Sequence, residues 1–204
     1  MSSTKKQLSN ASSTGGGGSH FETHVQASYV TLMLTGGFAP CLPCWPIDEI
    51  KLQGKVDGYD TDDLILFVQS PDGDDVRKLL GQVKHGLQIG DNERFRAVIQ
   101  AAWNDYRNPK MFTQGKDVIT VISDDLGSKE MAGVQSILGQ ARYPSTDEFI
   151  RRIELPRFNS GLTRDVLGVF QETLKKANDD QALSNQDLHQ FLKHFRLLGY
   201  DLGR

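Results

Sequence analysis

The residues best suited to chemistry are an acidic residue, Asp63, and the tripeptide Gln82-Val83-Lys84 further along the chain. Hydrolysis of a phosphodiester needs a divalent cation, oxygen ligands to hold it, and a positive charge near the attacking water or the phosphate. The Asp63 carboxylate, the Gln82 amide and the Val83 backbone carbonyl can supply oxygen ligands. Lys84 can supply the positive charge, so the set is suited to metal-dependent phosphodiester hydrolysis.

Two strands joined by a tight turn would bring these residues together. Asp63 precedes the apolar run 64–68, which is typical of a strand buried on both faces. Residues 71–74 (PDGD) form a strong turn signal, and 78–85 is expected to be the returning strand. In an antiparallel pair the start of one strand lies beside the end of the other. Because side chains alternate, Gln82 and Lys84 share a face and would meet Asp63 there.

Other acidic residues compete with Asp63 for the part of metal ligand. Asp57, Asp60 and Asp62 lie in the same acidic stretch, whose ordinary interpretation is a solvated loop. Asp63 is favoured because it directly precedes the buried strand, which can hold a short side chain firmly. Asp62 is expected to face the opposite side.

The remaining pattern predicts an α/β fold with a mixed central sheet flanked by helices. A helix is expected from Phe21, because apolar residues recur at helical spacing until Gly36-Gly37. Residues 1–19, rich in Ser, Thr and Gly, are expected to be a flexible arm. The other expected elements are strands at 47–53 and 117–123, an edge strand at 149–155, and helices from Phe95 to near Pro109 and at 129–142, 162–177 and 187–198.

Composition limits the class of protein. The chain has 204 residues with 38% hydrophobic and 24% charged residues, which is typical of a globular protein. It has no apolar run of membrane-spanning length and no signal-peptide pattern. Two cysteines without an export signal indicate a reducing, cytoplasmic location.

A net charge of −3 means that binding to nucleic acid would depend on a local basic patch. The densest basic pair is Arg151-Arg152. The candidate contacts to a phosphate backbone, most of which are expected to be ordinary surface charges, are Arg94, Arg96, Arg107, Lys110, Arg142, Arg151, Arg152 and Arg157.

Two other pairs have spacings known from metal sites. Cys41-x-x-Cys44 has no second pair, so a structural or incidental role is favoured over half a zinc site. His20 and His24 lie four residues apart on the first helix, with no third ligand evident. His85 is interpreted as a polar residue at a strand end, with a phosphate contact as the alternative.

The order of the motifs resembles the PD-(D/E)xK superfamily of metal-dependent nucleases, in its Mrr-like Gln-x-Lys variant. Phe21-Glu22 lies on a first helix, an Asp opens a buried strand, and Gln82-Val83-Lys84 closes the next. Longer segments are similar to the double-stranded DNA nuclease effector domain of bacterial anti-phage proteins, including CBASS effectors and the N-terminal domains of STAND or NACHT ATPases. Those segments are GGGGSHFETHVQASYV, DDLILFV, GQVKH, AAWNDYRN and DVITVIS.

The resemblance implies a restriction-endonuclease-like core at 20–155, followed by a helical extension at 156–204. It implies Asp63 as the main metal ligand, Gln82 in the place of the usual acid, Glu22 as the acid from the helix, and Lys84 as the catalytic lysine. Glu22 can equally be a surface residue of its helix. The implied cofactor is Mg²⁺ or Mn²⁺, with one or two ions left open.

The implied partners are double-stranded DNA, further copies of the chain on activation, and a fused ATPase or sensor region beyond residue 204, with no membrane. A catalytically degenerate module for nucleic-acid binding or assembly on the same fold is the alternative. An RNA substrate is also open, since the phosphate chemistry is shared.

Overall fold

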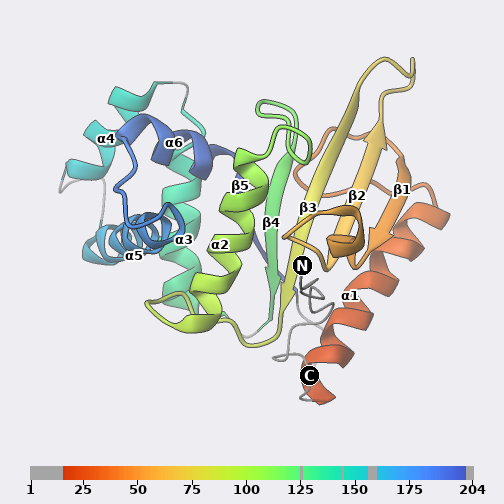
Figure 1. Cartoon of the computed structure of the whole chain (residues 1–204), viewed down its shortest axis with the longest axis horizontal. Coiled ribbons are helices and arrows are strands. Elements are labelled where there is room, and N and C mark those ends of the chain that lie inside the picture. The colour runs from red at the N-terminus through yellow and green to blue at the C-terminus, as the bar shows by residue number, and fades with distance from the viewer. Residues whose placement is uncertain (1–15, 125, 144, 156–159, 201–204) are drawn as a thin grey trace, which may run out of the picture.

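The computed structural model describes residues 16–124, 126–143, 145–155 and 160–200, which form a mixed sheet with helices on both faces (Figure 1). The five strands lie in the sheet in sequence order, with β1–β2 and β2–β3 antiparallel and β3–β4 and β4–β5 parallel. The expected α/β class with a mixed central sheet is therefore confirmed. The strands are β1 (Ile47–Leu52), β2 (Leu64–Gln69), β3 (Val76–Lys84), β4 (Val118–Ser123) and β5 (Phe195–Gly199).

Helices cover the two faces of the sheet unequally. One face carries α1, whose Phe21, Val25 and Tyr29 pack with inward-facing residues of β1 to β3 such as Leu66 and Val83. The other face carries the larger core, built by the remaining helices, with α2 over the sheet and α3 to α6 gathered towards β5 (Figure 1). The helices are α1 (Gly16–Leu34), the short 3-10 helix η2 (Gly54–Asp57), α2 (Glu93–Arg107), α3 (Ser128–Gln140), α4 (Thr146–Glu154), α5 (Gly161–Ala177) and α6 (Asn185–His194).

The strand β4 and the helix α2, both predicted from strong local patterns in the sequence, lie beside the strand that carries Gln82 and Lys84. All six residues of β4 are buried, because β3 and β5 flank the strand and helices cover both faces of the sheet. The side chain of Asn92 accepts a hydrogen bond from the Phe95 amide, which caps the start of α2. These elements hold in place the end of the sheet at which β3 and β4 finish.

The predicted edge strand at 149–155 is wrong, because this segment is the helix α4. The Ser145 side chain caps the helix by accepting from the Glu148 amide. Phe149 and Ile153, four residues apart, are both buried on one face. Helical spacing and a capping serine therefore outweigh the local strand propensity.

The predicted helix at 187–198 is also wrong beyond His194. The chain leaves α6 there and forms β5, in which the alternating residues Phe195 and Leu197 are buried. The strand pairs with β4 in parallel, with Phe195 opposite Ile119. The segment expected to be a purely helical extension thus contributes a strand to the central sheet.

The N-terminal prediction is partly wrong. The first helix begins at Gly16, so residues 16–19 of the expected flexible arm are helical, whereas residues 1–15 lie outside the described residues. Among the residues that the structure describes, no helix is both long enough and apolar enough to cross a bilayer.

The aromatic residues between α2, α5 and β5 provide a test of this shared core. The fully buried Phe170 ring meets the rings of Phe95 and Phe195 edge-on, with centroids 5.5 and 5.6 Å away. We expect Phe170→Ala to lower the free energy of unfolding by about 3–5 kcal/mol, as measured by urea denaturation. Leu34→Ala, at a side chain left largely exposed, should change it by less than about 0.5 kcal/mol. Equal effects of the two changes would contradict this packing.

Candidate functional site

The candidate site lies where the start of β2, the end of β3 and the first half of α1 meet. Leu64, the first residue of β2, pairs with Gly81 in β3. In an antiparallel pair the next residues outward are Asp63 and Gln82, so the register alone brings them opposite each other. The expected meeting of Asp63 with the Gln82-Val83-Lys84 tripeptide is present.

One oxygen of Asp63 is the centre of this cluster. Its Oδ2 accepts from Gln82 Nε2 at 2.6 Å, from the Val83 amide at 2.7 Å and from Lys84 Nζ at 2.9 Å. The Asp63 side chain is only 13% exposed, whereas the Lys84 side chain is 27% exposed. Lys84 is therefore anchored by an acid inside the protein while part of its own side chain stays exposed.

Glu22 on α1 belongs to the same cluster. The amide of Gln26, one turn along the helix, donates to Glu22 Oε1 at 3.0 Å and to the Asp63 carbonyl at 2.9 Å. Burial raises the pKa of Glu22 above its ordinary value, and the charge of Asp63 raises it further, while Lys84 acts in the opposite direction. Glu22 is thus a half-buried acid that interacts electrostatically with Asp63 and Lys84.

Asp62, which was expected to face the opposite side, interacts electrostatically with the same cluster. Burial raises its pKa first and the charge of Asp63 second, while Lys55, Lys84 and a hydrogen bond from the Gln82 side chain lower it. Asp62 lies before the first residue of β2, where strict alternation of side chains does not yet apply.

The other two competing acids are engaged elsewhere. Asp57, at the end of η2, forms an ion pair with Lys51, with Oδ2 and Nζ 3.3 Å apart. Asp60 Oδ2 accepts from the side-chain amide of Asn104 on α2 at 2.9 Å. Of the four acids in this stretch, Asp62 and Asp63 are the two that interact with Gln82 and Lys84.

The oxygen atoms at this end of the sheet are suited to bind a hard cation. The Val83 amide points to Asp63, and the carbonyl of the same strand residue points to the same side. Carboxylate, amide and backbone oxygens are the ligands that Mg²⁺ prefers. Within the described residues, however, no group of three or more His, Cys, Asp or Glu is arranged to hold a metal. A cation here would therefore draw on the Gln82 and Val83 oxygens as well as on Asp63 and Glu22.

Sequence reasoning missed Asp124, which lies beside the cluster. His85 Nδ1 and Asp124 Oδ2 are 2.5 Å apart, and the Gly86 amide donates to Asp124 Oδ1 at 2.7 Å. Lys84 pairs with Ser123 in the parallel β3–β4 ladder, so the residues that follow the two strands emerge at the same edge. The parallel pairing of β3 with β4 was the missing information, because nothing in the sequence around Asp124 marks it as a neighbour of His85.

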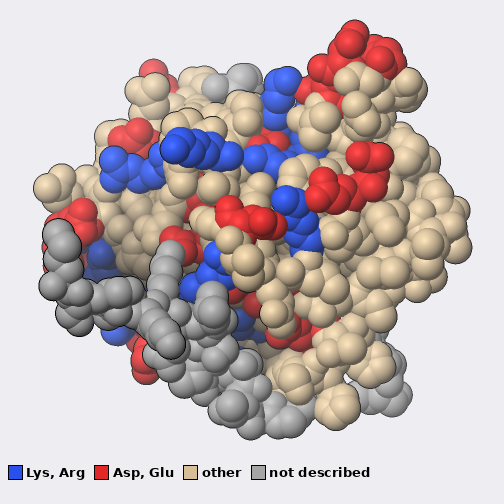
Figure 2. All heavy atoms as spheres, turned by 45° about the vertical axis from the view of Figure 1, so that its right-hand side comes forward, with Lys and Arg blue, Asp and Glu red and all other residues tan. Residues whose placement is uncertain are grey.

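The candidate phosphate contacts are mostly engaged with acids or carbonyls. Arg96 pairs with Asp91, and Arg94 donates to the His85 carbonyl. Arg151 and Arg152 both pair with Glu148, and Arg157 lies outside the described residues. In the view of Figure 2, basic and acidic side chains are interspersed, and several acidic side chains cover the β2–β3 turn.

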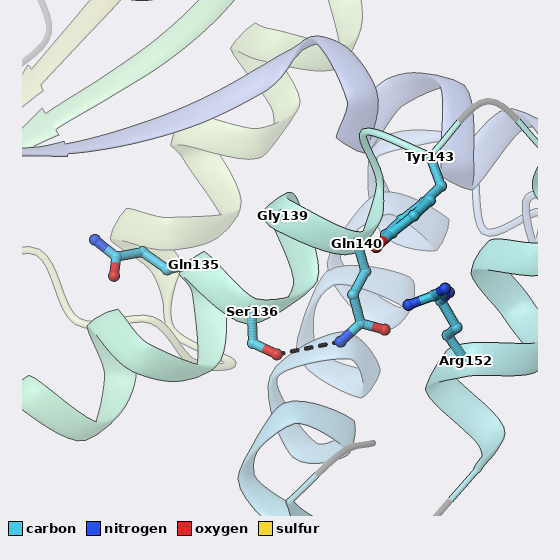
Figure 3. A pocket seen from close by; sticks show the side chains of 6 residues that line it. All are labelled: Gln135, Ser136, Gly139, Gln140, Tyr143 and Arg152. Atoms are coloured by element: carbon cyan, nitrogen blue, oxygen red, sulfur yellow. Dashed lines mark hydrogen bonds between the residues drawn. The ribbon is translucent and has the colours of Figure 1, made fainter.

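An open hollow of about 310 Å³ lies elsewhere, between α3 and α4 (Figure 3). The guanidinium of Arg152 lies over the Tyr143 ring at one side of it, 4.1 Å from the ring centroid. Neither this hollow nor a larger polar one of about 570 Å³, lined by residues such as Trp103 and Asp105, includes Asp63 or Lys84. The candidate site is therefore a polar region at the start of β2 and the end of β3, outside both hollows.

Comparison with known proteins gives no relative. No family model matches the chain, and neither a curated protein nor a solved structure matches it. The metal-binding and catalytic roles of the site residues therefore stay predictions.

The raised pKa of Glu22 makes a prediction about stability. The folded state binds the Glu22 proton more tightly than the unfolded state, so ionisation of Glu22 destabilises the fold as pH rises through the folded pKa. Glu22→Gln should therefore increase the free energy of unfolding at pH 7, by less than about 1 kcal/mol. This gain should disappear below the ordinary pKa of 4.5.

Chemical denaturation at several pH values measures this effect. Glu172→Gln, at an exposed position on α5, is the matched control and should leave stability unchanged. A loss of stability at pH 7 in the Glu22 variant would mean that the carboxylate is net stabilising and that its assigned environment is wrong.

Proposed function

We propose that this protein is a metal-dependent nuclease that hydrolyses phosphodiester bonds of double-stranded DNA. The observation that carries the proposal is the contact between Lys84 Nζ and Asp63 Oδ2, 2.9 Å apart at the shared end of two strands. Gln82 and Glu22 lie beside this contact and provide further oxygen donors. An ammonium and several oxygen donors at one edge are the parts that phosphodiester hydrolysis needs.

In this proposal Asp63, Glu22, the Gln82 amide oxygen and the Val83 carbonyl would hold Mg²⁺ or Mn²⁺. The bound cation would polarise the phosphate and help to ionise an attacking water. Lys84 would stabilise negative charge that develops on the phosphate oxygens as water attacks phosphorus and the bond to the sugar oxygen breaks. Asp63 positions Lys84 for this task, since the carboxylate fixes the ammonium from the protein side.

The biological setting is part of the same proposal. The resemblance of the sequence segments supports a restriction-endonuclease-like core acting in the cytoplasm as the effector of an anti-phage defence protein. Activation would come through assembly of several copies and a fused ATPase or sensor region. A nuclease kept inactive until assembly would not harm the DNA of its own cell.

The lysine is the first residue to test. Lys84→Ala should reduce Mg²⁺- or Mn²⁺-dependent cleavage of duplex DNA by about 100-fold or more, because the positive charge at the phosphate is lost. Cleavage is followed on supercoiled plasmid, with the protein also assayed when fused to an oligomerising module. Lys116→Ala is the control, since that half-exposed lysine pairs with Asp75 far along the sheet from Lys84.

Side-by-side substrates separate the alternatives. Duplex DNA, single-stranded DNA and RNA are assayed at equal nucleotide concentration. Cleavage confined to RNA would replace the proposed substrate while keeping the chemistry. If no substrate is cut with either metal, including by the oligomerised fusion, the nuclease proposal fails.

Metal binding has a readout that does not need activity. Because a cation that binds only the folded state stabilises it, Mg²⁺ or Mn²⁺ at about 100 times its dissociation constant should contribute about 2.7 kcal/mol to stability. The melting temperature should therefore rise with metal concentration in the wild type. The rise should be lost in Asp63→Asn and kept in Asp75→Asn, a control at an acid that pairs with Arg77 and Lys116. An equal rise in both variants would place the cation elsewhere.

A second candidate function is a binding or assembly module that no longer cuts. It is favoured by the neutral amide of Gln82 in the cluster and by the lack, within the described ranges, of a group of three acids, cysteines or histidines suited to a metal. Binding of duplex DNA without cleavage would favour this function over hydrolysis, if Asp63→Asn leaves that binding unchanged.

A further inference from the structure

A pair of cysteines lies in the loop between α1 and β1, apart from the candidate site. Cys41 and Cys44 are both free and both exposed. The base of the loop is closed by an antiparallel bridge between Phe38 and Pro46. Cys41 has a φ of 64°, in the left-handed region that is uncommon for residues with a side chain, and this bends the chain at the first cysteine.

The rest of the loop is fixed against the protein. Ala39 is buried, and Leu42 and Trp45 pack against the core beneath α1. The guanidinium of Arg77 lies over the Trp45 ring, 5.2 Å from its centroid. Ala39, Leu42 and Trp45 therefore hold the loop against the core, while both cysteine residues are exposed.

The spacing of the cysteines is compatible with a disulfide. Residues three apart are separated by at most about 10 Å in a fully extended chain. A bridge needs Cα atoms about 4.4–6.8 Å apart, a distance that a bent four-residue segment readily provides.

A positive charge from the far end of the chain faces the first cysteine. Arg196, the second residue of β5, donates through one guanidinium nitrogen to the carbonyls of Lys193 and Phe195. Burial lowers the pKa of Arg196, and its interaction with Cys41 acts in the opposite direction. Arg196 is therefore held in place by backbone acceptors and interacts with the Cys41 thiol.

Thiol exchange builds negative charge on the reacting sulfurs, and a neighbouring arginine is one of the features found beside reactive cysteines. From the exposed pair, the bent loop and Arg196 we propose that Cys41 and Cys44 form a reversible dithiol–disulfide site that exchanges with low-molecular-weight disulfides. Cys41 is the attacking thiol and Cys44 the resolving one. This inference is independent of the proposed nuclease function.

The exchange balances with oxidised glutathione as the oxidant. The Cys41 thiolate attacks one glutathione sulfur, the glutathione S–S bond breaks, and the first glutathione leaves as a thiolate that takes up the proton lost by Cys41. The Cys44 thiolate then attacks Cys41 Sγ, and the second glutathione leaves with the proton from Cys44. The protein gains one disulfide and loses two hydrogens, while oxidised glutathione becomes two reduced molecules.

The test uses the full chain, first reduced and then incubated with oxidised glutathione. Intact-mass spectrometry and peptide mapping should show loss of two hydrogen atoms and a Cys41–Cys44 bond that a dithiol reductant reverses. Cys44→Ser should instead retain one glutathione on Cys41. Cys41→Ser should react more slowly, because its remaining thiol lacks the neighbouring arginine.

A charge-matched pair of variants tests the part of Arg196. Arg196→Gln should slow the first exchange step roughly fivefold, the effect of one nearby charge in a watery environment. Arg196→Lys should restore most of the rate, and circular dichroism should verify that both variants fold. If the glutamine variant does not fold, the rates of the two cysteine variants and of the lysine variant decide the assignment.

Any of the following results would overturn the proposal. The first is a wild-type protein that accumulates glutathione on both cysteines without an internal bond. The second is a bond formed only between two chains. The third is an equal or faster first step at Cys44 than at Cys41, or a folded Arg196→Gln variant that reacts as fast as the wild type.

Discussion

A single carboxylate oxygen, Oδ2 of Asp63, holds the start of β2 to the end of β3. It accepts hydrogen bonds from the Gln82 side chain, the Val83 backbone and the Lys84 ammonium. Hydrogen bonds to an ionised acceptor are about twice as strong as neutral ones, so this oxygen orders both the strand end and the lysine. The position of α1 depends on the same residue, because Gln26 donates to the Asp63 carbonyl.

Among the residues that the structure describes, the acids that are buried or half-buried near the sheet include two kinds. Asp105 and Asp117 are nearly inaccessible, and backbone amides satisfy them: those of Asp60 and Thr61 donate to the first, and those of Lys78 and Thr113 to the second. Such acids fasten loops to helices or strands. They carry out a structural task and do not depend on an external ligand.

Glu22, Asp62 and Asp63 are of the other kind, because they form a cluster of like charges. The charge of Asp63 raises the pKa of both neighbours, in addition to the effect of burial. Mutual repulsion costs stability in the isolated protein, and clusters of this kind are typical of sites that bind a cation or do chemistry. The bond between Asp63 and Lys84 offsets part of the repulsion, which explains why the cluster is tolerated.

The C-terminal part of the chain is integrated into the same core as the sheet. His189 on α6 places Nε2 within 3.0 and 3.1 Å of the carbonyls of Ala141 and Tyr143, while Nδ1 lies 2.9 Å from the Thr146 hydroxyl. Two carbonyl acceptors identify Nε2 as the protonated nitrogen, so the ring ties α6 to the turn between α3 and α4. From α6 the chain runs directly into β5, which brings Arg196 to the loop with Cys41.

Local patterns in the sequence determined much of the fold and the centre of the site. The apolar runs at 64–68 and 117–123 became β2 and β4, and helical spacing from Phe21 and from Phe95 gave α1 and α2. The turn signal between two strands was sufficient to bring Asp63 to Gln82 and Lys84. A hairpin is a short-range structure, and its register follows from side-chain alternation and a short connection.

The tertiary structure alone decided the features that depend on distant pairing. Phe195 and Leu198 continue the helical spacing of α6, yet the backbone of 195–199 gains more by pairing with β4 along the open edge of the sheet. Asp124 reaches His85 because the parallel strands β3 and β4 end side by side, and the interaction of Arg196 with Cys41 joins β5 to the loop before β1. Residue spacing encodes which face a side chain takes within its own element, whereas the neighbours of that face are set by how the elements pack.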